Sequence, residues 1–270
     1  MRIAFIGGGN MANALIGGLV KRGTAPRDIL AIDVNESTRE GLVKQYGIET
    51  ASASSDRLRD YDTLVLAVKP QVLKDVAQAL QPHLNGQLVI SIAAGIRASD
   101  LARWLGGHNQ IVRCMPNTPA LIGMGITGLA ALSGVDSDQR KRAESVLGAA
   151  GQIVWVDKES QLDGVTAISG SGPAYVFYFI EALEQAAREL GFTPEQGRQL
   201  AIATFTGASQ LAAQSSEPAS VLRERVTSKG GTTFAALSSF ERDNIKAAIV
   251  RGVNAANTRA RELGDELGDA

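Results

Sequence analysis

The chain has few of the residues from which disulfide frameworks and metal sites are built. Its 270 residues include a single cysteine, Cys114, and two histidines, His83 and His108. One cysteine excludes an internal disulfide, and two well-separated histidines form no recognisable metal-binding cluster. We therefore predict no metal site. We also expect a reducing, cytoplasmic setting, because the chain has no internal disulfide that an oxidising compartment would favour.

The chain also lacks a charge excess and long apolar runs. Its 28 acidic residues balance 27 basic ones, which leaves a net charge of -1 and no electrostatic footprint for nucleic acid or an anionic membrane. No apolar run approaches the ~18 residues of a membrane span, and the apolar stretch at the N-terminus is too short for a secretory signal. We expect a small-molecule partner, with neither nucleic acid nor membrane involved.

Two kinds of pattern divide the chain. Up to about residue 157, short β-branched runs such as "RIAFI", "DTLVLAV" and "QIVRCMP" alternate with amphipathic helical stretches, which is typical of an open parallel α/β sheet. From about Leu162 onward the segments have helical spacing throughout, as in "PAYVFYFIEALEQAAREL". We predict an α/β protein with a Rossmann-type dinucleotide-binding domain over residues 1–160 and an all-α domain over residues 161–270.

Several helices of the second half have no clear polar face. Tyr175, Phe177, Tyr178 and Phe179 fall within five residues of one of them. A helix that is apolar around most of its circumference has to be buried, and about 110 residues are few for burying several such helices. We therefore expect a partner subunit; a compact monomeric bundle is the alternative.

The clearest local motif lies near the N-terminus. The run from Gly7 to Ala12, "GGGNMA", fits G-x-G-x-x-A, follows an apolar run and opens a helical pattern. Asp33 follows about 20 residues later, where the dinucleotide fingerprint has an acidic residue for the ribose hydroxyls. These features predict a dinucleotide site with its pyrophosphate at a helix N-terminus. A plain strand-to-helix turn and an ordinary surface carboxylate are the alternatives.

Three further segments contain residues that are typical of ligand-binding loops. "AVKPQ" and "MPNTP" each close a predicted strand, where ligands of such sheets bind, although both also suit rigid structural loops. "VTSKGGTTFAAL" places two glycines and two threonines before an apolar helical stretch. It predicts a second helix N-terminus suited to a carboxylate, or else an ordinary capped loop.

Proton donors for carbonyl reduction are scarce. That reaction needs a His, a Lys or a Tyr–Lys pair, but after Lys158 the chain has only Lys229 and Lys246 as lysines. A protonated imine is instead neutralised by hydride transfer and needs no strong acid at that step. The scarcity therefore favours reduction of C=N over C=O.

Five segments together resemble one known family. "FIGGGNMA", "AVKPQ", "MPNTP", "ISGSGPAY" and "VTSKGGTT" occur in an order and at spacings similar to those of pyrroline-5-carboxylate reductase, and the resemblance runs from about Arg2 to Gly264. It implies NAD(P)H-dependent reduction of the C=N bond of L-1-pyrroline-5-carboxylate to L-proline, the last step of proline biosynthesis. It also implies interlocked homodimers, often joined into larger rings, whose helical domain serves dimerisation and substrate binding.

The resemblance also implies roles for individual residues. The cofactor-binding residues are Gly7, Gly8, Gly9, Asn10, Met11, Asp33, Asn35, Ser37, Val68, Lys69, Pro70, Met115, Pro116 and Asn117. The substrate carboxylate is assigned to Ser228, Gly230, Gly231, Thr232 and Thr233. Thr233 is the catalytic candidate, because it matches the family's hydroxyl that contacts the ring nitrogen.

Two residues, Lys229 and Asp33, depart from the family pattern. Lys229 stands where many members have proline, and we expect its ammonium group to face water. Asp33 stands where it would repel the 2′-phosphate of NADPH, with Arg39 and Lys69 as the nearby cations, so NADPH and NADH both remain possible.

Two other functions are compatible with parts of this sequence. A β-hydroxyacid dehydrogenase resembles the chain at "GSGPAYVFYF" but carries a catalytic lysine on that helix, where this chain has none. A non-catalytic dinucleotide-binding protein would keep the first glycine loop without needing "SKGGTT".

Overall fold

The computed structural model describes residues 1–268, and packing divides the chain into two compact units. The first unit comprises Met1–Ser171 together with the chain from Ala256 onward, and the second is Gly172–Ala255. The division lies later than the predicted one at residue 160, because the helical segments that follow the last strand pack on the sheet of the first unit. Each unit is described separately below.

An eight-stranded sheet forms the centre of the first unit. Its spatial order is β3-β2-β1-β4-β5-β6-β7-β8. The strands are β1 (Ile3–Ile6), β2 (Ile29–Ile32), β3 (Glu49–Ala51), β4 (Thr63–Leu66), β5 (Leu88–Ser91), β6 (Ile111–Met115), β7 (Gly125–Ala131) and β8 (Gly151–Trp155). The order of β3 to β6 is that of a Rossmann fold, whose ligands bind off the carboxyl ends of the strands near β1 and β4.

The sheet is parallel except where β7 pairs with β6. Only residues 116–124 join these two strands, and their one regular element is a 3₁₀ turn, η4 (Thr118–Ile122). Because a parallel crossover needs a dozen or more residues, so short a link returns the chain antiparallel, which differs from the all-parallel expectation. After β7, helix α5 (Ser137–Gly148) makes a full crossover and β8 runs parallel to β7.

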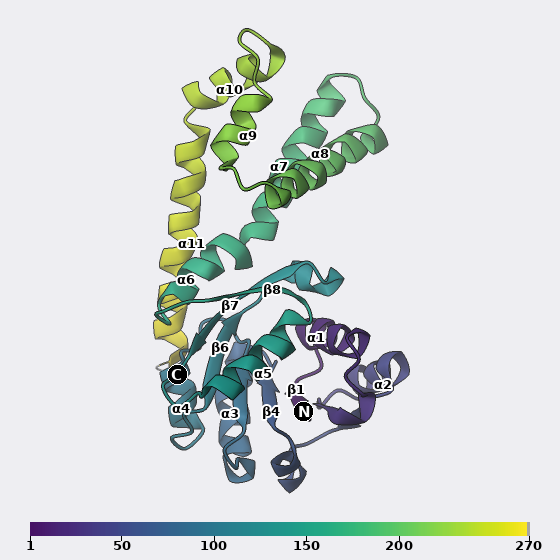
Figure 1. Ribbon diagram of the computed structural model, residues 1–270, viewed down its shortest axis with the longest axis vertical. Helices are drawn as coiled ribbons and strands as arrows, with labels where there is room; N and C mark the ends of the chain where they lie inside the picture. The colour runs from purple at the N-terminus through teal and green to yellow at the C-terminus, as the bar shows by residue number, and fades with distance from the viewer. Residues whose placement is uncertain (269–270) are drawn as a thin grey trace. The chain divides into compact units, whose positions relative to one another are not determined.

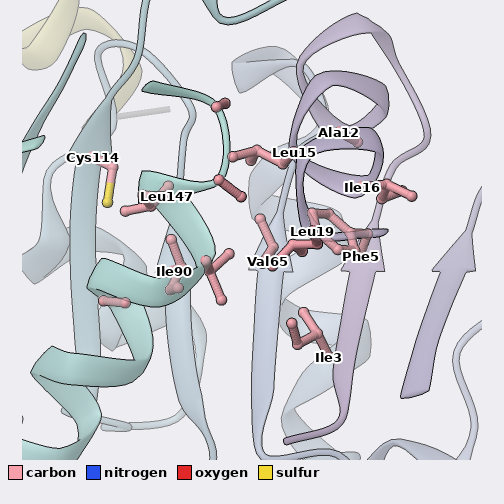
Figure 2. Close-up of a cluster of buried hydrophobic side chains, with 14 of the residues drawn as sticks. Ile3, Phe5, Ala12, Leu15, Ile16, Leu19, Val65, Ile90, Cys114 and Leu147 are labelled. Atoms are coloured by element: carbon pink, nitrogen blue, oxygen red, sulfur yellow. The ribbon is translucent and has the colours of Figure 1, made fainter. Parts of the chain in front are cut away.

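Helices cover both faces of the sheet (Figure 1). One face packs against α1 (Asn10–Lys21), α2 (Glu36–Tyr46) and α5, and the other against α3 (Pro70–Leu80) and α4 (Ala98–Trp104). Alternate residues of a strand point to opposite faces, so Phe5 joins the first cluster while Ile6 joins the second. Figure 2 shows the first cluster, with Phe5 packed beside Leu19 of α1. Burial on both faces explains the continuous apolar runs seen in the sequence.

The first unit also contains helical segments that follow the sheet. After β8 come α6 (Gln161–Val165) and a π-helical turn, η5 (Thr166–Gly170). The C-terminal end of α11 (Ile245–Gly268) packs against the region of α4, where Leu267 joins the second apolar cluster and Asp265 forms an ion pair with Arg97.

The second unit is entirely helical, as expected. It contains α7 (Gly172–Glu189), α8 (Pro194–Gln214), α9 (Ala219–Arg225), α10 (Thr232–Arg242) and the first part of α11. Thr193 begins α8 with a capping box closed by Gln196. Large apolar side chains stay exposed on the single chain, at 60% for Phe177, 72% for Tyr178 and 77% for Leu190. Among the described residues, no helix has both the length and the apolarity to span a membrane.

Candidate active site

The glycine loop after β1 is shaped by close backbone contacts. Gly7 has a φ of +100°, and a Cβ there would lie 2.6 Å from the carbonyl oxygen of Ala67. Its N–H donates to the carbonyl of Ile32 at 2.7 Å, which ties the loop to the end of β2. A Cβ at Gly8 would lie 2.8 Å from Thr38. Gly7 is therefore required by the fold of the loop itself, and Gly8 has little room for a side chain.

Gly9 differs from its two neighbours. It is exposed, and no described heavy atom lies within 4 Å of a Cβ built there. It is also the N-cap of α1 and, as a glycine, has no side chain with which to cap the first turn. The N–H groups at the start of α1 thus face an open space at the positive end of the helix dipole. This cradle fits the pyrophosphate of a dinucleotide, beside the predicted Asn10 and Met11.

The end of β2 presents a second cluster of predicted residues. The Asp33 carboxylate accepts the N–H groups of Gly8 and Asn35, each at 2.8 Å. Asn35 in turn is the N-cap of α2, and its Oδ1 accepts the backbone N–H and the hydroxyl of Ser37. The structure therefore brings Asp33, Asn35 and Ser37 together beside the glycine loop.

The sequence identified Arg39 only as a nearby cation, but the structure shows how it is anchored. One guanidinium nitrogen, Nη1, donates to the backbone carbonyls of Asp33 and Val34, at 2.7 and 3.1 Å. The guanidinium is thus held at the end of β2, against the backbone of residues 33 and 34.

The two remaining cofactor segments lie at the same edge of the sheet, because β4 and β6 are parallel to β1. Val68 follows β4 next to Gly7, and the extended Lys69 precedes Pro70 at the first position of α3. Met115 ends β6, and Asn117 Oδ1 accepts the N–H of Ile126 at 2.9 Å. All four segments predicted to bind the cofactor therefore meet at the carboxyl edge.

Cys114 precedes Met115 but is no candidate nucleophile. Its thiol is fully buried, and this burial raises its pKa far above the usual range, so that the reactive thiolate does not form near neutral pH. Within residues 1–268, no group of three or more His, Cys, Asp or Glu side chains is arranged to hold a metal ion.

The substrate-binding candidates form a turn in the second unit. Gly230 has a φ of +73°, and the N–H of Gly231 donates to the carbonyl of Ser228 at 3.0 Å. Gly231 is the N-cap of α10, and Thr232 and Thr233 occupy the first turn. As at Gly9, a glycine cap leaves the N–H groups of a helix N-terminus without a side-chain partner of its own. The structure brings the five predicted residues together, and the turn suits a carboxylate.

Two family models match parts of this chain. A family model described as pyrroline-5-carboxylate reductase dimerisation matches residues 159–263, and one described as NADP oxidoreductase, coenzyme F420-dependent, matches residues 2–95. The pyrroline-5-carboxylate reductase of Pseudomonas aeruginosa is 44% identical over 99% of this chain and 98% of its own. The chain belongs to the pyrroline-5-carboxylate reductase family. It is therefore an oxidoreductase that uses NAD(P)H, and it carries the family's dimerisation region.

Solved members of the pyrroline-5-carboxylate reductase family have the same fold. A structure from Coxiella burnetii superposes with a TM-score of 0.93 at 39% identity, covering 97% of this chain and 98% of the other. A Plasmodium falciparum structure, whose description states that NADP is bound, has a TM-score of 0.85 at 30% identity and covers 98% of each chain.

Proposed function

We propose that this protein reduces the C=N bond of L-1-pyrroline-5-carboxylate to give L-proline, the last step of proline biosynthesis. The observation that carries the proposal is a pair of helix N-termini, each capped by a glycine. The cap of α1 is Gly9, and that of α10 is Gly231. One suits the cofactor pyrophosphate and the other the substrate carboxylate, and family membership supplies the reaction class.

The residues of the chain act by binding and orienting. The bound nicotinamide supplies the hydride, and the first turn of α1 holds the cofactor phosphates. The first turn of α10 and the Ser228 hydroxyl hold the substrate carboxylate, while the Thr233 hydroxyl orients the ring nitrogen. Because a protonated imine is already cationic, positioning of the two reactants is the main contribution of the protein.

A direct assay tests this function. Oxidation of NADH and of NADPH is followed at the nicotinamide absorbance, with and without pyrroline-5-carboxylate, and we expect oxidation that depends on the imine. Absence of oxidation with either cofactor, although cofactor binding is demonstrated, would leave a non-catalytic dinucleotide-binding protein.

We further propose that NADPH is accepted in spite of Asp33. Its carboxylate is engaged by two N–H donors, and the Arg39 guanidinium is anchored at the same strand end. Arg39, together with Ser37, which is exposed in the first turn of the same helix, can therefore meet a 2′-phosphate at this position.

Arg39→Gln tests this assignment. We expect KM for NADPH to rise about tenfold, because the variant removes the positive charge that pairs with the 2′-phosphate. KM for NADH should rise by about twofold at most, because NADH carries no 2′-phosphate. Lys44→Gln, which removes another cation of α2, serves as the control. Equal rises for both cofactors would assign Arg39 only to holding the backbone of residues 33–34.

We also propose a homodimer as the smallest functional assembly, built through residues 159–263. The exposed Phe177 and Tyr178 support it, since another copy would remove this apolar surface from water. Light scattering on the purified protein distinguishes a monomer, a dimer and a larger ring of dimers.

A further inference from the structure

Segment 159–170 covers one face of β6 close to the cofactor edge. Arg113 and Met115 lie two residues apart on this strand, so their side chains leave the same face. Arg113 is only 7% exposed, and its Nη1 lies 2.9 Å from Glu159 Oε1. Asp163 lies 3.9 Å from its other terminal nitrogen. This ion cluster, in which Arg113 is buried and the two carboxylates are partly buried, holds segment 159–170 over the strand.

The same segment ends in an unusual helical turn. Residues Thr166–Gly170 form a π-helix, a form that is rare and that is frequently found at functional sites. The hydroxyls of Thr166 and Ser169 donate to carbonyls four residues earlier, in Leu162 and Val165. Such bonds often bend a helix, and here they accompany the turn that presents Gly170 to β6.

Gly170 lies directly against Met115. A Cβ at Gly170 would be 2.6 Å from the terminal methyl, Cε, of the Met115 side chain and 3.9 Å from its Cγ. The thioether therefore occupies the space that any larger residue at position 170 would take. Two residues further along the chain, Asn117 is held to β7, because its Oδ1 accepts the N–H of Ile126. The strand end that carries the cofactor-binding candidates Met115 and Asn117 is thus held by two separate contacts.

We propose that Gly170 is a positioning residue for the cofactor. By lacking a Cβ it lets the Met115 thioether lie against the π-helical turn and so keeps this side chain away from the space that the cofactor requires at the end of β6. The inference deepens the proposed function and rests on it for the identity of the cofactor site. It concerns a residue outside the cofactor-binding set that the sequence predicted.

Gly170→Ala is the first variant to measure. The atom that the new methyl group would meet is Met115 Cε, the end of a flexible side chain. The substitution therefore displaces the Met115 side chain without disturbing the backbone. We expect the thermal midpoint of unfolding to stay close to that of the wild type, while the Kd for NADPH rises about tenfold. Gly164→Ala is the matched control from the same segment, since no described heavy atom lies within 4 Å of a Cβ built there.

A second substitution separates positioning from a general structural effect. In a Met115→Ala background there is no thioether to displace, so adding Gly170→Ala should change the NADPH Kd by less than about twofold. An equal loss in both backgrounds, or no loss in either, would overturn the proposal. The Kd is measured without substrate, so the result still decides the role of Gly170 if the wild-type protein shows no imine-dependent oxidation and the proposed function fails.

Discussion

Gly9→Asp is expected to weaken NADPH binding about a hundredfold while the free energy of unfolding stays equal or rises slightly. The backbone of Gly9, with φ of -67° and ψ of -174°, is open to any residue, and its Cβ position is clear of described atoms. Aspartate is also a favourable N-cap, so its carboxylate satisfies the N–H groups of α1. The same carboxylate then repels the cofactor pyrophosphate, and a hundredfold loss corresponds to about 2.8 kcal/mol.

Gly9→Asn is the matched control for that charge. Its side chain caps the helix as well and is similar in size, but it is neutral, so we expect a loss of roughly tenfold at most. Cofactor affinity is measured by titrating NADPH fluorescence, and stability by chemical unfolding. Gly7→Ala should behave in the opposite way and lower stability, because of its positive φ and the nearby carbonyl of Ala67. If Gly9→Asp binds NADPH as tightly as the wild type, α1 is not the pyrophosphate site.

Thr233→Ala is expected to lower kcat by roughly ten- to a hundredfold and to leave the Kd for NADPH within about twofold. A hydrogen bond to a charged group contributes about 1.5–3 kcal/mol, and the proposed bond to the ring nitrogen is lost in this variant. Thr233 lies in the first turn of α10, where alanine favours the helix, so the substitution should not unfold it. Steady-state kinetics with pyrroline-5-carboxylate give kcat, and a titration without substrate gives the cofactor Kd.

Two further variants at position 233 identify the responsible group. Thr233→Ser keeps the hydroxyl and should retain most of the activity, whereas Thr233→Val keeps the shape without the hydroxyl and should match the alanine variant. Full turnover in Thr233→Val would remove the hydroxyl from the mechanism and restrict the site to the turn and the helix N-terminus.

The glycine turns were predictable because their signal is local. A short apolar run, three glycines and a helical pattern describe a strand, a turn and a helix within one stretch of chain, and the structure places Gly9 at the start of α1 accordingly. The helical second unit was equally visible from its spacing. The short edge strand β3 leaves no such signal, since three residues with little burial make no periodic pattern.

The position of Asp33 in the sequence does not reveal which groups its carboxylate contacts. The fingerprint places this carboxylate at the ribose, and that contact stays a prediction. The structure adds that its two oxygens accept the N–H groups of Gly8 and Asn35. Gly8 lies 25 residues away along the chain, so this bond exists only because β1 and β2 are neighbours in the sheet.

The sequence by itself determined what depends on neighbouring residues: the glycine turns before α1 and α10, the apolar strands, the helical second half and the motifs that place the chain in its family. Tertiary structure alone decided which distant residues meet. The antiparallel β7, the ion cluster around Arg113 and the contact of Gly170 with Met115 all join segments that no local pattern connects. The reason is physical, because backbone propensity and hydrophobic periodicity act over a few residues, whereas close packing is settled only when the whole sheet and its covering helices assemble.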